Sequence, residues 1–196
     1  MKYMPDCIIP AGGSSSRMGF WKPGLVWGKL TMIEKMVSEA LTAGCRVIVA
    51  GGFRFDDVNH ILEKYQERNE NILLVFSQDW SLGMDETLRP ALRKIKSERF
   101  FIVPSDMPFI VCDDYRRLSE ISDSMENPIV LRPIFDGKPG HPVLMRKEVS
   151  KVLLTSPAGV PVRKVLEKYK TVSIPWEHDG VIRDFDKFSD YEAFKP

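Results

Sequence analysis

The sequence predicts an α/β fold of three layers, a Rossmann-like, mostly parallel sheet with helices on both faces. Short runs rich in Ile, Val, Leu and Phe alternate with longer runs whose apolar residues recur at helical spacing, which indicates βαβ units. The strand-like runs are continuously apolar, as is typical of strands buried on both faces. Right-handed crossovers place the carboxyl ends of such strands at one edge of the sheet, where ligands bind.

Strands and helices alternate strictly over the first two thirds of the chain. The first helix has apolar residues at i, i+3 and i+4, namely Ile33, Met36 and Val37, and Gly44 supplies its stop. Strands are predicted at residues 7–10, 46–52, 72–76, 99–106 and 128–133. Helices are predicted at residues 33–43, 58–65, 88–95 and 113–124.

The pattern is less regular from Phe135 onward. A strand at 141–145, helices at 147–154 and 160–168, and short strands at 171–175 and 181–185 are predicted. The last two strands are expected to pair as a hairpin about residues 178–180, and Ser189 is expected to cap a final helix. Since no repeat, low-complexity stretch or linker interrupts the chain, we predict a single domain over residues 1–196.

Composition excludes several classes of protein. Apolar residues make up 43% and charged residues 28% of the chain, which is ordinary for a globular domain. A net charge of +1 predicts neither a nucleic-acid nor a membrane partner. No apolar run approaches the ~20 residues of a membrane span, and no signal-peptide pattern starts the chain, so a cytoplasmic protein is expected. Cys7, Cys45 and Cys112 form no CxxC pair, and the first two are expected to be core residues.

A loop rich in glycine and serine, AGGSSSRMG at residues 11–19, follows the first predicted strand. Gly12 and Gly13 allow the backbone to approach a ligand closely, and successive N–H groups and serine hydroxyls offer donors to anionic oxygens. Arg17 suits bidentate contact with phosphate, and Lys22 adds a point charge. These features together suit a triphosphate.

Other phosphate-binding loops do not match this spacing. A Walker A loop needs GxxxxGK[ST], and a dinucleotide-binding loop needs GxGxxG, whereas this loop reads GGxxxxxG. On residue types alone, an ordinary flexible loop remains an alternative.

The loop resembles the AGGxSxRMG…K signature of the molybdenum cofactor nucleotidyltransferases, a group of MobA-like NTP transferases. The resemblance implies the nucleotide-diphospho-sugar transferase type of fold, with the loop and its basic residues holding a nucleoside triphosphate. The nucleotide-binding residues that it implies in the loop are Ala11, Gly12, Gly13, Ser14, Arg17 and Lys22. Gly83-Met84 and Thr87-Leu88 resemble the GMxxSL stretch that approaches the base and sugar, although Asp85 and Glu86 also suit a helix N-terminus.

Acidic residues at two places resemble the metal site of this family. Asp106 follows the strand at 99–106 and matches the family's DxP aspartate, which implies a Mg²⁺ ligand. Taken alone, Asp106 suits capping of the turn before Pro108 better than metal binding. RDFDKFSDY at residues 183–191 resembles DIDTPEDY, and makes Asp184 or Asp186 a second metal candidate, with both side chains on one face of the expected strand.

The stretch at residues 137–145 resembles the GxxGHPVLF of the cytidylyltransferase branch and implies that Gly140 and His141 lie on the acceptor side. A structural role for His141 remains an alternative. The chain departs from the family at SPAGVPVR (residues 156–163), which lacks the acidic residue of GDxGAR, and at Pro23-Gly24.

The resemblance implies a Mg²⁺-dependent nucleotidyltransferase, with catalytic roles for Arg17, Lys22 and Asp106. An acceptor phosphate would take CMP from CTP, with residues 1–134 binding the triphosphate and residues 135–196 the acceptor, such as molybdopterin, for delivery to a molybdoenzyme. Guanylyl transfer, a sugar-phosphate or polyol-phosphate acceptor, and a non-catalytic nucleotide-binding regulator remain alternatives.

Overall fold

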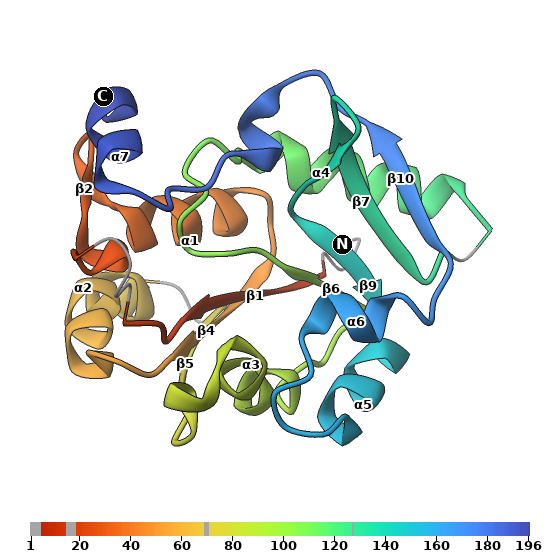
Figure 1. Ribbon diagram of the computed structural model, residues 1–196, viewed down its shortest axis with the longest axis horizontal. Coiled ribbons are helices and arrows are strands. Elements are labelled where there is room, and N and C mark those ends of the chain that lie inside the picture. Colours follow the sequence, from red (N-terminus) through yellow and green to blue (C-terminus); the bar gives the residue numbers. More distant parts are fainter. Residues whose placement is uncertain (1–4, 15–18, 69–70, 127) are drawn as a thin grey trace.

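The strand-like runs of the sequence form a sheet that lies between two layers of helices (Figure 1). The structure is a computed structural model and describes residues 5–14, 19–68, 71–126 and 128–196. In this part of the chain the sheet contains eight strands: β1 (Asp6–Ala11), β4 (Arg46–Gly51), β5 (Ile72–Phe76), β6 (Arg99–Ile102), β7 (Val130–Phe135), β8 (Lys138–Pro139), β9 (Val143–Arg146) and β10 (Thr171–Pro175). Their order is β10-β7-β9-β6-β1-β4-β5, with β8 paired to β7.

The sheet is mostly parallel. β1 pairs in parallel with β4 and β6, β4 with β5, and β7 with β10, whereas β9 runs antiparallel to both β6 and β7. The carboxyl ends of the parallel strands therefore meet at one edge, from which the chain after β1 and the chain after β6 both leave. This confirms the predicted fold class.

Helices cover both faces of the sheet because their apolar stripes pack on opposite sides of the same strands. One face carries α1 (Met32–Thr42), α2 (Phe55–Arg68) and α4 (Cys112–Ser124), and the other carries α3 (Met84–Leu92), α5 (Lys147–Thr155) and α6 (Val162–Leu166). In Figure 1, α1 and α4 lie above the sheet and α3 and α5 below it. Cys7 and Cys45 are core residues as predicted, and burial raises the pKa of Cys45 to about 12.

The glycine- and serine-rich loop at residues 11–19 is separated from α1 by short elements. It is followed by the 3₁₀ turn η1 (Lys22–Gly24) and by a small hairpin of β2 (Val26–Trp27) and β3 (Leu30–Thr31). α1 then begins with a capping box, in which the Thr31 hydroxyl accepts the Glu34 N–H and the Glu34 carboxylate accepts the Thr31 N–H.

The predicted strand at 181–185 and its hairpin are wrong. The segment starts as the 3₁₀ turn η3 (Asp179–Ile182) and continues without regular structure to Lys187. Its alternation of apolar and charged residues arises because Val181 and Phe185 are buried in two different clusters, not on one sheet face. Asp184 and Asp186 therefore do not lie on a strand, contrary to the sequence-based expectation.

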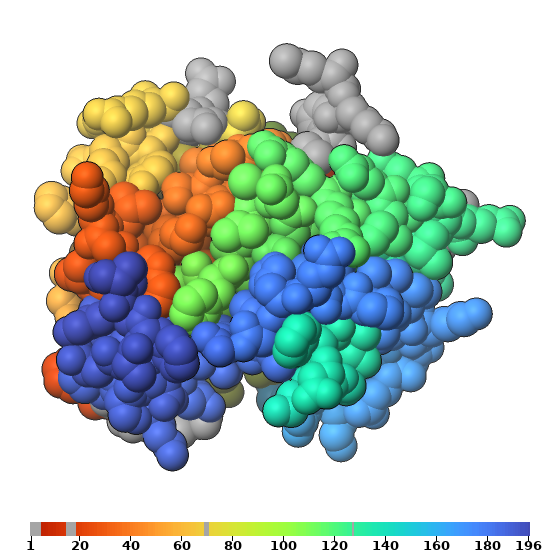
Figure 2. Space-filling view, turned by 90° about the horizontal axis from the view of Figure 1, so that it is seen from above, coloured from red at the N-terminus to blue at the C-terminus, as the bar shows by residue number. Residues whose placement is uncertain are grey.

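The last helix, α7 (Phe188–Phe194), begins one residue before Ser189, so Ser189 is not its cap. The Asp190 carboxylate instead accepts the Lys187 N–H at 3.3 Å. An aromatic cluster and a hydrogen bond from the Tyr191 hydroxyl to the Val26 carbonyl oxygen, at 2.6 Å, hold α7 against the β2–β3 hairpin. Figure 2 shows the dark-blue C-terminal helix against this orange segment.

None of the helices in the described ranges has both the length and the apolar character that are needed to cross a membrane.

Candidate active site

The end of β1 is built for close packing. Ala11 and Gly12 are buried, and Gly13 and Ser14 are exposed. The Gly12 carbonyl oxygen accepts the Phe53 N–H at 3.0 Å, so the chain after β4 lies directly against the loop. A β-carbon on Gly12 would lie 2.6 Å from the Cγ2 atom of Thr87, which leaves room only for glycine.

A pocket of about 250 Å³ opens beside this loop. Its lining residues come from the end of β1, from η2 (Trp80–Leu82) and from the start of α3; they are Pro10, Gly12, Gly13, Ser14, Trp80, Ser81, Gly83, Met84 and Thr87. Thr87 is fixed because its N–H and its hydroxyl both donate to the Gly83 carbonyl oxygen, each at 3.1 Å. The candidate nucleotide-binding residues Gly12, Gly13, Ser14, Gly83 and Thr87 thus line one pocket, although they come from distant parts of the sequence.

Lys22 connects three segments of the chain at the carboxyl edge of the sheet. Its Nζ atom donates to Asp106 Oδ2 at 2.8 Å and lies 3.5 Å from Asp186 Oδ1. The side chains of Lys22 and Asp106 are 15% and 18% exposed, so this pair is shielded, whereas Asp186 is 62% exposed. The segments after β1 and after β6 therefore converge, as expected of two loops that leave strand carboxyl ends.

The charges of Asp106 and Asp186 affect the pKa of Asp184. Partial loss of solvation raises the pKa of Asp184, and the negative charges of Asp106 and Asp186 raise it further. Three carboxylates and one ammonium group thus share a small volume with an excess of negative charge. Oxygen ligands of this kind suit Mg²⁺, which binds through one or two carboxylates together with waters and substrate phosphates. In the described ranges, no group of three His, Cys, Asp or Glu side chains is arranged to hold a metal.

The loop before β9 lies next to this group. The Gly140 N–H donates to the Pro133 carbonyl oxygen and the His141 N–H to the Val181 carbonyl oxygen, at 2.9 and 2.7 Å. A β-carbon on Gly140 would lie 2.5 Å from the Val181 carbonyl oxygen, so η3 packs directly on this loop. Figure 2 shows these two segments, in blue and teal, side by side.

The surroundings of His141 disfavour the protonated form of its imidazole. Burial lowers the pKa of His141 and the positive charge of Arg132 lowers it further, against a bond to the Ile102 carbonyl oxygen and the charge of Asp106. The Nδ1 atom donates that bond at 3.4 Å. The charges of Asp106 and Arg132 thus act on His141 in opposite directions.

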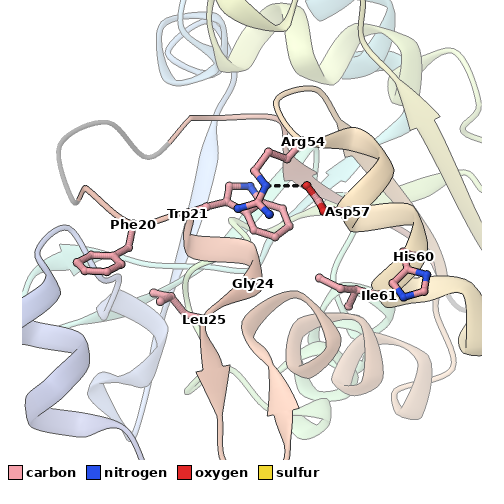
Figure 3. A pocket seen from close by; sticks show the side chains of 8 residues that line it. All are labelled: Phe20, Trp21, Gly24, Leu25, Arg54, Asp57, His60 and Ile61. Atoms are coloured by element: carbon pink, nitrogen blue, oxygen red, sulfur yellow. Dashed lines mark hydrogen bonds and ion pairs between the residues drawn. The ribbon is translucent and has the colours of Figure 1, made fainter.

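A second pocket, of about 350 Å³, lies between η1 and α2 (Figure 3). The Arg54 guanidinium stacks over the Trp21 ring at 4.4 Å and pairs with Asp57 at 2.6 Å. A β-carbon on Gly24 would lie 2.5 Å from the same ring, which explains the departure from the family at this position. Since Trp21 directly precedes Lys22, these contacts fix the start of η1 and hence the position of Lys22.

Arg17, a candidate catalytic and nucleotide-binding residue, lies outside the described residues. Sequence reasoning missed Trp80 as a pocket residue, because an aromatic residue near a helix start resembles an ordinary core position. It also missed how the SPAGVPVR segment is held. Asp85 accepts the Gly159 N–H at 2.7 Å, and the Arg89 guanidinium donates to the Leu154 and Ser156 carbonyl oxygens at 2.6 and 2.7 Å.

Comparison with known proteins gives matches along almost the whole chain. The sequence profile of the "MobA-like NTP transferase domain" matches residues 7–172. The chain is 30% identical, over 190 residues, to the molybdenum cofactor cytidylyltransferase of Escherichia coli K12. This match covers 97% of the present chain and 95% of the Escherichia coli protein.

Solved structures share the fold at lower identity. Rv0371c from Mycobacterium tuberculosis H37Rv superposes with a TM-score of 0.80 at 18% identity, covering 98% of each chain, and another structure of that protein is a complex with manganese. The molybdopterin-guanine dinucleotide biosynthesis protein A of Archaeoglobus fulgidus superposes with a TM-score of 0.68 at 17% identity, covering 96% of this chain and 95% of its own.

Proposed function

The chain belongs to the MobA-like NTP transferase family and is a nucleotidyltransferase, and from this we propose that it moves CMP from CTP to a molybdopterin-type phosphate, releasing pyrophosphate. The observation that carries the proposal is the contact of Lys22 with Asp106 and Asp186 at the carboxyl edge of the sheet. A cation flanked by carboxylates at the carboxyl edge of such a sheet suits the binding of a metal-bound triphosphate.

In the proposed reaction, an oxygen of the acceptor phosphate attacks the α-phosphorus of the triphosphate. A new P–O bond forms, the bond between the α-phosphorus and the oxygen that bridges it to the β-phosphate breaks, and that oxygen leaves with pyrophosphate. No covalent enzyme intermediate is needed, so the protein contributes positioning and charge stabilisation. Lys22 and Arg17 would stabilise the charge that grows on the leaving pyrophosphate.

Mg²⁺ is the proposed cofactor, held by Asp106 with Asp184 or Asp186 as the second carboxylate. When bound, it supplies positive charge that neutralises phosphate oxygens. The shielded position of Asp106 and the crowding of negative charge around Asp184 support this assignment. Without a metal, Lys22 offsets part of that charge.

CTP is the first choice because of the similarity to the cytidylyltransferase of Escherichia coli. GTP is the second candidate because the fold is also that of the guanine dinucleotide biosynthesis protein. The pocket lined by Gly12, Gly83 and Thr87 is the proposed site of the base and sugar. Gly140 and His141 are proposed for the acceptor side, with delivery of the product to a molybdoenzyme as the next step.

The experiment is an assay of pyrophosphate release with CTP, GTP, ATP and UTP in turn, in the presence of Mg²⁺ and molybdenum cofactor. We expect release with one nucleotide, and only when the acceptor is present. Asp106→Asn and Lys22→Ala should each lower the rate by about 10²–10³-fold. Asp123→Asn and Lys29→Ala change exposed residues of the same types outside the proposed site and are the matched controls.

Nucleotide binding without release in any combination would favour a non-catalytic regulator. Release with a sugar phosphate or a polyol phosphate, but not with molybdopterin, would keep the chemistry and replace the acceptor.

A further inference from the structure

Arg132 is a half-buried arginine in the middle of β7 that lacks a counter-charge. Its Nε atom is buried without a hydrogen-bond partner. No hydrogen bond or ion pair within the described ranges involves its guanidinium group. Taking an unpaired charge out of water costs free energy, so an arginine in this situation is expected to have a partner that comes from outside the protein.

The face of the sheet that carries Arg132 is only partly covered. Val130, two residues earlier in β7, packs in the core with Val149 of α5 and Val165 of α6. Ser173, the partner of Arg132 in β10, is exposed. Side chains two residues apart in a strand point to the same face, as do those of paired residues. Arg132 therefore lies where the covered part of this face ends and the open part begins.

The open part of this face adjoins the candidate active site. Gly140 donates its N–H to the carbonyl oxygen of Pro133, the residue after Arg132, and His141 Nδ1 donates to the Ile102 carbonyl oxygen at the end of β6. Asp106 follows β6 and contacts Lys22. The loop that carries Gly140 and His141 thus lies between Arg132 and the segment that carries Asp106.

A guanidinium group with unused N–H donors matches a phosphate group in shape and charge, and two parallel N–H···O bonds to a phosphate are both strong and directional. These features suit an anionic small molecule that enters from the open face.

We propose that Arg132 binds the phosphate group of the acceptor and positions it for attack, while Lys22 and Asp106 face the triphosphate. This inference rests on the proposed function, because it assigns the second substrate of the same site. Arg132 is a binding residue, and its loss affects the acceptor and not the nucleotide.

The test is calorimetric titration of phenyl phosphate, a phosphate monoester, into protein saturated with Mg²⁺ and a non-hydrolysable analogue of the nucleotide that it binds. The filled nucleotide site then cannot take up the probe. The unmodified protein is expected to bind, and Arg132→Met and Arg132→Gln to bind about 10- to 100-fold more weakly, as expected for loss of charge-assisted hydrogen bonds. Arg132→Lys should be intermediate, since a lysine keeps the charge but loses the fork. Arg93→Gln changes an exposed arginine directly after α3; it is the matched control and should bind normally.

Thermal unfolding without ligand separates a binding role from a structural one. If Arg132 serves to bind a ligand, Arg132→Met removes an unpaired charge, and the melting temperature stays equal or rises. A lower melting temperature together with unchanged phenyl phosphate affinity overturns the inference, as does absence of binding by the unmodified protein.

The nucleotide titration reports separately on the proposed function. If a nucleotide binds and is turned over while Arg132→Met binds phenyl phosphate as tightly as the unmodified protein, only the role of Arg132 fails. If no nucleotide binds, the proposed function itself fails.

Discussion

Because Gly12 has no β-carbon, the loop after β1 can approach α3 closely. Any side chain on Gly12 would point at Thr87, with Cγ2 at 2.6 Å, Oγ1 at 3.0 Å and the Gly52 nitrogen at 3.3 Å from the new β-carbon. Thr87 cannot easily turn away, because its hydroxyl donates to the Gly83 carbonyl oxygen. The wall of the pocket is therefore rigid at this point.

Gly12→Ala is expected to lower the free energy of unfolding by about 1–3 kcal/mol, the cost of an extra carbon in a packed region. Chemical denaturation measures it. Gly13→Ala is the matched control, since a β-carbon on Gly13 has nothing within 4 Å. Adding Thr87→Ser, which removes the nearest methyl group, should recover part of the loss. Equal stability of the two alanine variants would show that the loop moves away from α3 without cost.

Sequence reasoning found Lys22 and Asp106 because they match motifs of the family that the chain resembles, and both lie in segments that follow strand carboxyl ends. It did not find Arg132. A charged residue within an apolar run is also found on the solvated face of a strand, and the sequence does not show which face later elements cover. Only the folded sheet, in which β9 and β10 flank β7, shows that Arg132 has no counter-charge among the described residues.

Between elements, Asp114 joins α4 to the chain that follows β10. Its carboxylate is buried and accepts three N–H groups: Val111 N at 2.8 Å, Trp176 Nε1 at 2.7 Å and His178 Nε2 at 2.9 Å. The first of these caps α4, and the other two fix the segment that leads into η3. Because the Val181 carbonyl oxygen of η3 accepts the His141 N–H, this contact also supports the acceptor side.

Asp114→Ala should lower the free energy of unfolding by about 2–4 kcal/mol, because it removes the helix cap and leaves the buried Trp176 N–H without an acceptor. Urea denaturation followed by tryptophan fluorescence measures the change. Asp113→Ala alters the neighbouring carboxylate, which is 81% exposed, and should cost less than about 1 kcal/mol. A loss no larger than that of Asp113→Ala would mean that the segment after β10 is held by its apolar contacts alone.

Helices and strands were predictable where one spacing of apolar residues continues through the whole element. The helices were found in this way because each buries a single stripe of apolar residues. The parallel strands were found because they are buried on both faces and are therefore continuously apolar. The error at residues 181–185 has the opposite cause, because Val181 and Phe185 serve two separate clusters and their spacing imitates a strand. The direction of β9 was equally hidden, because periodicity carries no information about pairing partners.

Across the whole molecule, negative charge collects at the edge of the sheet where the carboxyl ends meet, although the net charge of the chain is only +1. Asp106, from the middle of the sequence, and Asp186, 80 residues later, contact the same ammonium group of Lys22. No described group of three His, Cys, Asp or Glu side chains is arranged as a complete cage for a cation. A metal held here would therefore depend on oxygens from a second ligand, and the phosphates of a nucleotide supply them.

Metal binding and nucleotide binding are accordingly expected to be coupled. Mg²⁺ alone should leave the melting temperature unchanged, the nucleotide alone should raise it, and both together should raise it by more than the nucleotide alone. A nucleotide at 100 times its Kd adds about 2.7 kcal/mol of stability, which is easily detected. Coupling is reciprocal, so the nucleotide Kd should fall by the same factor as the metal Kd, and chelation with EDTA should reverse both.

Asp106→Asn is expected to abolish the additional effect of the metal while the shift from nucleotide alone remains. Strong stabilisation by Mg²⁺ without nucleotide would contradict this and point to a metal site that the protein completes by itself.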